Sequence, residues 1–398
     1  YDNPLTRDQF EKLNLPASWW HIDHAEFWGY FSPMKAGITS ADIITTVSPR
    51  YAREIRTPAF GEGFDGLLAA QTHKIVGIIN GIDDCTWDPR RDPLLPSNYS
   101  ADDDIRTIKH AIAETLSDLV EPSISRLPDR IHSPVTHSSV ALMAGPAASR
   151  PTLPSPSARP TDAEIEKADE PTAVTTSERR GLTASPDRRA PMFGFIGRFV
   201  EQKGLDLVLA AIPRLLTEHD LRFVLLGSGQ PDLESRAREL ALLFPEQVRV
   251  QIGYDETLAH RIEAAADFFL MPSRFEPCGL NQLYSLRYGT IPIVSPIGGL
   301  ADSVVDADSR HLEEGTATGF HLRQIDTEGI VARVRDVMAM WHSNRDMLDS
   351  IARRGMQLDL GWSRSAAAYR QLYEAPLTRP IEDLLRGTTL HSVNDPNT

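Results

Sequence analysis

Two cations in one loop could hold a diphosphate. The loop GRFVEQKG, residues 197–204, carries Arg198 and Lys203 between an apolar run and an amphipathic one. An arginine can bind a diphosphate through two parallel hydrogen bonds, and a lysine can neutralise it as a point charge. The alternative interpretation of this spacing is a pair of solvated surface cations.

A second loop, within residues 273–305 (SRFEPCGLNQLYSLRYGTIPIVSPIGGLADSVV), combines an acid with bare backbone. The sequence predicts a helix that begins near Cys278, so the N–H groups of Cys278, Gly279 and Leu280 would face a bound phosphate. Gly279 has no Cβ and lets an anion approach closely. Glu276 would then serve a neutral polyol or a developing positive charge. Its alternative role is that of an acid that satisfies the helix dipole.

Two further loops offer weaker signals. Tyr254 follows a predicted strand and presents an aromatic face on which a base could stack, although a lone tyrosine is more often a packing residue. Gly298 and Gly299 form a strand-to-helix turn of bare backbone, which could line the same pocket or only make a tight turn.

Other chemistry has less support in the sequence. His21, Asp23 and His24 superficially resemble metal ligands, but no third ligand site follows at a known spacing, and packing in this aromatic-rich segment is the preferred interpretation. Cys278 could be a nucleophile, yet no base is tied to it by sequence. G-x-S-x-G, H-E-x-x-H, Walker A and C-x-x-C motifs do not occur. These motifs therefore give no signal for a metal ion or a cofactor.

The elements that would position these loops are regular from Met192 onward. Five apolar runs, each followed by a segment with helical spacing, predict a doubly wound α/β fold with a parallel sheet. They are MFGFIGRF, RFVLLGSG, VRVQIGY, DFFLMPS and IPIVSP. All four loops leave the carboxyl ends of these strands, where open parallel sheets bind ligands, so the loops should converge.

The rest of the chain is less uniform. Residues 42–48 and 73–83 predict strands, and PRYAREI predicts a helix that opens on a proline. Residues 104–121 could form one helix. From about residue 126 to residue 191 the composition shifts to Pro, Ser, Thr, Ala and Arg, which predicts a disordered insertion. Three helices are expected after residue 326.

Bulk properties limit the partners and the compartment. A net charge of −14 argues against nucleic acid as the main partner. No apolar run is long enough to span a membrane, and the N-terminus does not read as a signal peptide. Cys85 and Cys278 are the two cysteines, which fits a reducing compartment. The length of 398 residues allows two domains.

Taken together, the motifs resemble one family. GRFVEQKGLDLVLAAIPRLL, QIGYDETLAHRI and SRFEPCGLNQLYSLRYGTIPIVSPIGGLADSVVD are similar to the C-terminal half of bacterial glycogen synthases and plant starch synthases. KAGITSADIITTVSPRYAREI and GIINGIDDCTWDPRRDPLL resemble the second half of that family's N-terminal domain. The resemblance covers about residues 1–100 and 191–375. Neighbouring transferases carry a second acid eight positions after the first, and Tyr284 stands there in this chain.

The resemblance implies a GT-B fold, in which two Rossmann-like domains face a cleft. Residues 1–103 would be the C-terminal part of the acceptor-side domain, which is therefore incomplete. Residues 104–190 would hold a helix and the disordered insertion. Residues 191–360 would form the nucleotide-sugar donor domain, and residues 361–398 a helix that returns toward the N-terminal domain, plus a tail.

The family's activity is transfer of glucose from ADP-glucose to the non-reducing 4-OH of an α-1,4-glucan, glycogen or starch, with retention and without a metal. By resemblance, Arg198 and Lys203 hold the donor diphosphate and Glu276 supports the transferred glucose. Tyr254 would lie near the adenine, and Asn80 would reach the glucose from the other domain. The remaining residues expected to bind the donor are Cys278, Gly279, Leu280, Asn281, Gly298 and Gly299. The resemblance implies the cytoplasm, or the plastid stroma for a plant or alga.

Three departures from the family pattern keep a second hypothesis open. The family's K-T-G-G-L-A-D stretch and its catalytic histidine segment are expected before Tyr1, Ile297 replaces the usual threonine, and the insertion replaces a short linker. We therefore expect this chain alone to be nearly inactive. The alternative is a non-catalytic remnant that still binds the donor or a glucan.

Overall fold

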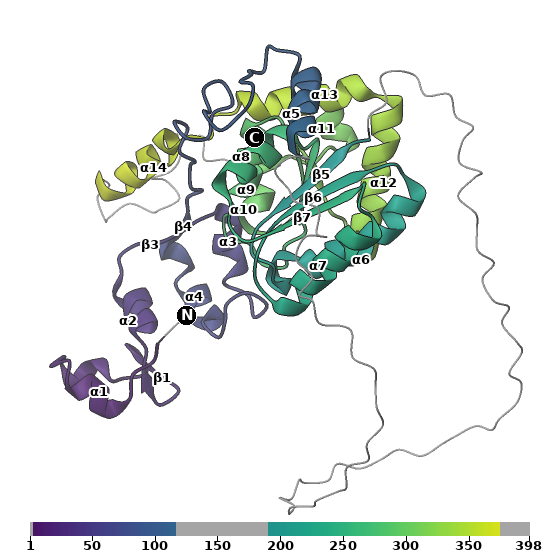
Figure 1. The fold of residues 1–398 in the computed structure, drawn as a ribbon. Helices are drawn as coiled ribbons and strands as arrows, with labels where there is room; N and C mark the ends of the chain where they lie inside the picture. Colours follow the sequence, from purple (N-terminus) through teal and green to yellow (C-terminus); the bar gives the residue numbers. More distant parts are fainter. Residues whose placement is uncertain (1–2, 117–189, 375–398) are drawn as a thin grey trace, which may run out of the picture. The chain divides into compact units, whose positions relative to one another are not determined.

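The computed structural model describes residues 3–116 and 190–374. Its central feature is a six-stranded, all-parallel sheet in the order β10-β9-β8-β5-β6-β7 (Figure 1). The strands are β5 (Met192–Ile196), β6 (Arg222–Gly227), β7 (Val248–Ile252), β8 (Phe268–Met271), β9 (Ile291–Val294) and β10 (Phe320–His321). Read from β7, this is the order 3-2-1-4-5-6 of dinucleotide-binding Rossmann folds, so the chain reverses direction across the sheet between β5 and β8.

Alternation along the strands explains why both faces of this sheet are buried. Phe193 and Phe195 of β5 point into one hydrophobic cluster, which also holds apolar residues of α6 (Leu205–Glu218), α7 (Pro231–Leu243), α12 (Thr327–Ser343) and α13 (Arg345–Gln357). Met192 lies in a second cluster, with residues of α5 (Ile105–Thr115) and α8 (Glu256–Ala265). Successive side chains of a strand face opposite sides, so helices cover both faces, as Figure 1 shows.

The N-terminal part contains two small sheets. β3 (Ile44–Thr46) pairs in parallel with β4 (Ile75–Gly77), and β1 (Glu26–Phe27) pairs antiparallel with β2 (Tyr30–Phe31). The helices here are α1 (Arg7–Glu11), α2 (Pro33–Ser40), α3 (Pro49–Glu54) and α4 (Asp65–Ala70), with 3-10 turns η1 (Ala17–Trp19) and η2 (Thr72–Lys74). The C-terminal helix α14 (Trp362–Glu374) packs on β4 through Ala368 and Leu372.

Two connections between these parts lie side by side. The N–H of Ile82, just after the Asn80-Gly81 turn, donates to the carbonyl of Leu360 at 2.8 Å, next to a parallel bridge between Ile82 and Gly361. A Cβ on Gly81 would lie 2.4 Å from the backbone nitrogen of Trp362, so only glycine permits this approach. In the second connection, Leu95 and Tyr99, which follow the Asn80-Gly81 turn in the chain, pack in the hydrophobic cluster that holds residues of α5 and α8.

Most predicted elements form, and two differences concern the six-stranded sheet and the helices on it. The helix expected near Cys278 is α9 (Asn281–Arg287), which begins three residues later because Gly279 has a φ of +70°, outside the helical region. The two-residue strand β10 was not predicted, because two residues give no readable period. The short helices α10 (Gly298–Ser303) and α11 (Ser309–Glu313) complete the domain. The predicted disordered insertion lies outside the described residues, apart from its flanks.

None of the described helices combines the length and the apolar composition that crossing a bilayer requires.

Candidate functional site

Lys203 and Glu276 meet at the point where the strand order reverses. Lys203 follows β5 and Glu276 follows β8, and these strands are neighbours in the sheet. Lys203 Nζ donates to Glu276 Oε2 at 2.5 Å, and the hydroxyl of Ser273 donates to the same oxygen at 3.2 Å. The side chain of Glu276 is 8% exposed and that of Lys203 is 24% exposed. The predicted cation and the predicted acid therefore form one charged pair at the ligand-binding edge of the sheet.

A glycine allows the two loops to approach each other. The turn η5 (Glu201–Lys203) ends at Gly204, which has a φ of +72°. A Cβ on Gly204 would lie 2.2 Å from the carbonyl oxygen of Pro272, at the end of β8. Any other residue would push Lys203 away from Glu276, so this glycine sets the geometry of the pair.

Arg198 lies on the same loop but does not join the ion pair. Its side chain is exposed, and its Nη2 donates to the side-chain oxygen of Gln202 at 3.1 Å. The amide of Gln202 in turn donates to the carbonyl of Phe275 at 3.0 Å. Arg198 is thus held beside the loop of Glu276 with its remaining donors open to solvent, where an anion could reach them.

The backbone from Cys278 to Leu280 forms a turn before α9 rather than its first helical residues. Within the described residues, the N–H groups of Cys278, Gly279 and Leu280 have no protein acceptor. Gly279 packs tightly, since an added Cβ would lie 2.4 Å from the side-chain oxygen of Gln282. Leu280 is 39% exposed. Asn281 was expected to bind a ligand, but its side-chain amide donates to the carbonyl of Ile196 at 2.7 Å. This bond joins β5 to α9.

Cys278 is a buried thiol that contacts the other part of the site. Burial raises its pKa to about 11, against a smaller opposing effect of a hydrogen bond from the backbone N–H of Asn80. A thiol with this pKa stays protonated near neutral pH, which removes it as a nucleophile. The same hydrogen bond brings the Asn80 turn to the loop after β8. Asn80 also lines a cavity of about 130 Å³ together with Gly81, Leu283 and Asp302.

The N–H groups of Gly298 and Gly299 already have protein partners. Gly298 donates to both carboxylate oxygens of Glu54, each at 3.1 Å, and Gly299 donates to the carbonyls of Glu276 and Pro277 at 3.3 and 3.0 Å. A Cβ would lie 2.0 Å from Glu276 O at the first glycine and 2.1 Å from Cys278 O at the second. The turn therefore serves close packing against the Glu276 loop, which its glycines permit.

Tyr254 lies after β7 and is 86% exposed, so its ring is available to a ligand. Tyr284, the residue in the position of the missing second acid, is instead covered by an aromatic ring from the N-terminal segment. The ring of Trp87 stacks on it at 3.8 Å between centroids. No local pattern of the chain signals this contact, because 197 positions separate the two residues.

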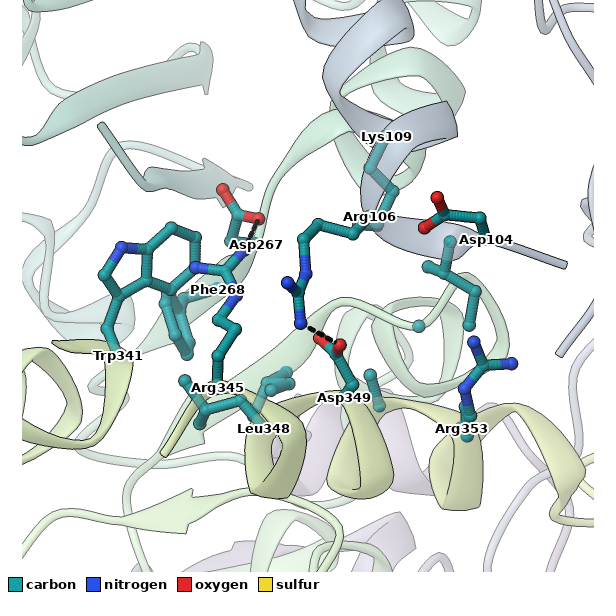
Figure 2. Close-up of a pocket in the computed structure, with 14 residues that line it drawn as sticks. Asp104, Arg106, Lys109, Asp267, Phe268, Trp341, Arg345, Leu348, Asp349 and Arg353 are labelled. Carbon is teal, nitrogen blue, oxygen red and sulfur yellow. Dashed lines mark hydrogen bonds and ion pairs between the residues drawn. The ribbon is translucent and has the colours of Figure 1, made fainter. Parts of the chain in front are cut away.

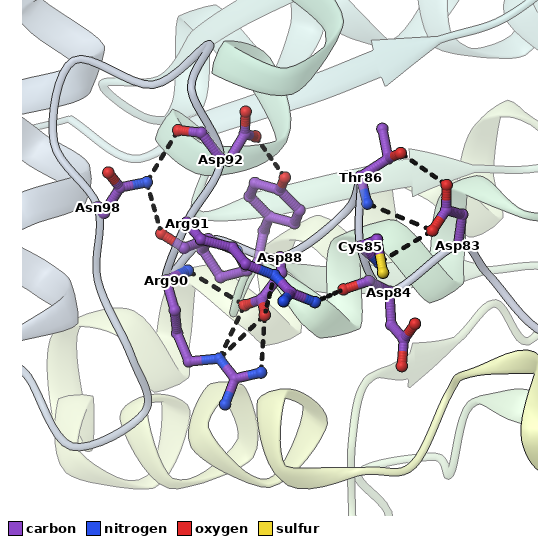
Figure 3. Close-up of polar contacts among 11 residues, drawn as sticks. Asp83, Asp84, Cys85, Thr86, Asp88, Arg90, Arg91, Asp92 and Asn98 are labelled. Atoms are coloured by element: carbon purple, nitrogen blue, oxygen red, sulfur yellow. Dashed lines mark hydrogen bonds and ion pairs between the residues drawn. The ribbon is translucent and has the colours of Figure 1, made fainter.

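The segment that carries Trp87 is fixed by its own acids (Figure 3). Asp83 accepts from the hydroxyl of Thr86 at 2.6 Å, and the buried Asp88 accepts from Arg90 at 2.7 and 2.8 Å. Asp92 accepts from the hydroxyl of Tyr288 at 2.5 Å and lies 2.7 Å from Nδ1 of His260. Asp92 thereby joins this segment to α8 and to the residue after α9.

Neither the histidine segment near residue 21 nor the pocket of Figure 2 contributes to this site. His21, Asp23 and His24 are exposed, so the expectation that these side chains serve packing is wrong. Within the described residues they also form no ligand cluster for a metal. The pocket in Figure 2 lies at the opposite ends of β8 and β9 and has a volume of only about 40 Å³. Its charges are paired, as in Arg106 with Asp349, so it suits a water rather than a nucleotide.

Two family descriptions match separate parts of the chain. "Starch synthase catalytic domain" matches residues 1–70, and "Glycosyl transferases group 1" matches residues 184–354. The first match ends before the insertion predicted from composition, and the second begins within its last residues.

Similar proteins are known over most of this sequence. The glycogen synthase of Halorhodospira halophila is 43% identical over 94% of this chain and 64% of its own length. That of Paracidovorax citrulli is 40% identical over 94% of this chain and 60% of its own length. The catalytic domain of Starch Synthase IV from Arabidopsis thaliana, solved with ADP and acarbose, superposes with a TM-score of 0.71 at 28% identity, over 95% of this chain and 65% of that one. The chain spans less than two thirds of the length of each.

Proposed function

This chain belongs to the family of bacterial glycogen synthases and plant starch synthases, has the GT-B glycosyltransferase fold, and on that premise we propose that it binds ADP-glucose for glucosyl transfer to an α-1,4-glucan. The observation that carries the proposal is the Lys203–Glu276 pair, 2.5 Å apart, where the strand order reverses. Rossmann-type sheets bind nucleotides at that edge.

The diphosphate of the donor would bind between Lys203 and Arg198. Both belong to the loop after β5. The N–H groups of Gly279 and Leu280, which have no acceptor among residues 3–116 and 190–374, lie on the loop after β8. When the bond from the anomeric carbon to the diphosphate breaks, negative charge grows on ADP. Fixed cations and N–H groups stabilise that charge without reorganisation, which is usually a large part of catalysis. No metal ion takes part in this proposal.

The glucose would lie against Glu276. A carboxylate that is 8% exposed interacts strongly with the positive charge that develops at the anomeric carbon, because little water screens it. Asn80 would contact the same sugar from the other side, since its backbone already bonds to Cys278 two residues after Glu276. The acceptor's O4 then bonds to the anomeric carbon on the face that ADP leaves, and one proton is released.

The adenine would stack on Tyr254, which is exposed at the end of β7. The solved relative from Arabidopsis thaliana is described as bound to ADP and acarbose, which supports a nucleotide and a glucan-like sugar as ligands here. ADP-glucose, rather than UDP-glucose, is our choice on the resemblance of the motifs.

Calorimetry with ADP-glucose on the purified 398-residue chain tests the proposal. We expect binding that Lys203→Ala weakens at least about tenfold, because one charge-assisted bond is worth roughly 1.5–3 kcal/mol. Glu276→Ala should weaken binding of ADP-glucose more than that of ADP. Arg214→Ala, which removes an exposed cation paired with Glu218 elsewhere on the domain, is the matched control.

A folded chain that binds neither ligand would overturn the proposal. A turnover assay distinguishes an active transferase from a protein that only binds the donor. Release of ADP in the presence of a maltooligosaccharide supports transfer by this chain, and binding of ADP-glucose without release of ADP supports a donor-binding protein. We expect little release from this chain alone.

A further inference from the structure

Two carboxylates join α3 to α10. Glu54, the last residue of α3, accepts the N–H of Gly298, the first residue of α10, at 3.1 Å to each oxygen. Asp302 of α10 accepts the N–H of Arg50 of α3 at 2.7 Å. Each helix thus supplies one carboxylate, and that carboxylate accepts a backbone N–H of the other helix. We call these four residues the α3–α10 clasp.

The clasp is shielded from water. The side chain of Glu54 is 13% exposed, and Asp302 is 3% exposed. Arg50 Nε also donates to Glu54 at 3.0 Å, and the hydroxyl of Ser48 bonds to Asp302. Hydrogen bonds to ionised groups are stronger than neutral ones, and low exposure reduces their screening.

The clasp reaches Glu276 through the glycine turn. A Cβ on Gly298 would lie 2.0 Å from the carbonyl oxygen of Glu276, so the two backbones are in contact. Gly299 donates to that same oxygen at 3.3 Å. A carboxylate from α3 therefore holds the turn on which the backbone of Glu276 rests.

We propose that Glu54 is a positioning residue of the donor pocket: by holding the N–H of Gly298, it fixes the turn that supports Glu276. The expected effect on ligand binding rests on the proposed function. The structural link from Glu54 through Gly298 to Glu276 rests on the contacts alone. Glu54 bonds to the protein and not to a reacting atom, so it acts through Gly298. Its loss should misplace the acid that meets the sugar and leave the cations that meet the diphosphate in place.

The chain offers a matched control. Arg7 and Glu11 form an ion pair at the same spacing as Arg50 and Glu54, also on a short helix of the N-terminal part. The Glu11 side chain is 64% exposed, and within the part of the chain that the structure describes it bonds to Arg7. Glu11→Ala therefore removes the same kind of pair without touching a second element.

Amide hydrogen exchange on the full chain tests the geometry without any ligand. In Glu54→Ala we expect exchange of the N–H groups of Gly298, which donates to Glu54, and of Gly299, which donates to the Glu276 carbonyl, to rise about tenfold, from loss of a charge-assisted bond. Glu54→Gln keeps an oxygen that can accept the Gly298 N–H and should restore most of the protection. Unchanged exchange of the Gly299 N–H in Glu54→Ala, relative to Glu11→Ala, overturns the inference.

Calorimetry with ADP-glucose and with ADP tests the consequence. Glu54→Ala should weaken ADP-glucose about fivefold or more and ADP at most about twofold, with rescue by Glu54→Gln. Equal weakening of both ligands would indicate a general loss of structure and contradict a positioning role. If the wild-type chain binds neither ligand, the proposed function fails, and the exchange measurement still decides whether the clasp supports the Glu276 loop.

Discussion

The ring of Trp87 stacks on the ring of Tyr284, with 3.8 Å between centroids and an interplanar angle of 13°. The other face of Trp87 lies on His260 at 3.7 Å. Three rings from three separate elements therefore form one stack. Tyr284 stands eight residues after Glu276, where neighbouring transferases carry an acid, and here that position anchors the N-terminal segment to the domain of the six-stranded sheet.

Removal of the central ring should destabilise the chain. Trp87→Ala leaves a gap between two facing rings, so we expect a loss of about 3 kcal/mol in the free energy of unfolding. Urea denaturation followed by circular dichroism measures it. Trp28→Ala is the control, because Trp28 is 85% exposed and should change stability by less than about 0.5 kcal/mol. Equal effects of the two variants would show that the stack contributes nothing specific.

Gly204 should tolerate no side chain. Gly204→Ala places a Cβ 2.2 Å from Pro272 O, so it should destabilise by about 2–3 kcal/mol and weaken ADP-glucose binding through displacement of Lys203. The matched variant is Gly63→Ala, which has a similar φ of +85° but open space around the Cβ. It should cost only the backbone strain of about 1 kcal/mol. Thermal melts and calorimetry of both variants separate the clash from the strain.

Glu263 should make stability depend on pH. Burial raises the pKa of its carboxyl to about 8, despite the opposing effects of the Ser285 hydroxyl and Lys109. The folded chain therefore binds a proton that the unfolded chain has lost above pH ~4.5, so stability should fall as pH rises toward 8. We expect a decline of about 1 kcal/mol or more between pH 5.5 and 8.

Urea midpoints at the two pH values measure this decline. Glu263→Gln has no proton to release and should show a flatter profile than the wild type. Parallel profiles of the two proteins would contradict the raised pKa.

The two cysteines should differ in reactivity. Cys278 is buried and its thiol has a pKa of about 11, whereas Cys85 is exposed. The thiolate is the reactive form, so iodoacetamide at pH 8 should modify Cys85 and leave Cys278 intact in the folded chain. Mass spectrometry of peptides reads the result, and urea should make both react. Fast modification of Cys278 without urea would show that the Asn80 contact opens in solution.

The sequence predicted the donor-side sheet well, for a physical reason. A parallel strand buried on both faces is a continuous apolar run, and β5, β6, β8 and β9 each follow from such a run, as in MFGFI, whereas the edge strand β7 (VRVQI) alternates apolar with polar residues. Because loops after such strands meet at one edge, it also placed Lys203 and Glu276 in one site. It failed for the start of α9, where Gly279 adopts a positive φ that letters alone do not reveal.

The sequence by itself determined which groups could meet an anionic sugar donor: two cations, one acid and a glycine turn, set by residue type and by the order of strands. Only the tertiary structure decided which of them touch. It paired Lys203 with Glu276, left Arg198 exposed and gave the Gly298 N–H to Glu54. Contacts between residues 244 positions apart depend on how the elements pack, and no local pattern of the chain encodes that packing.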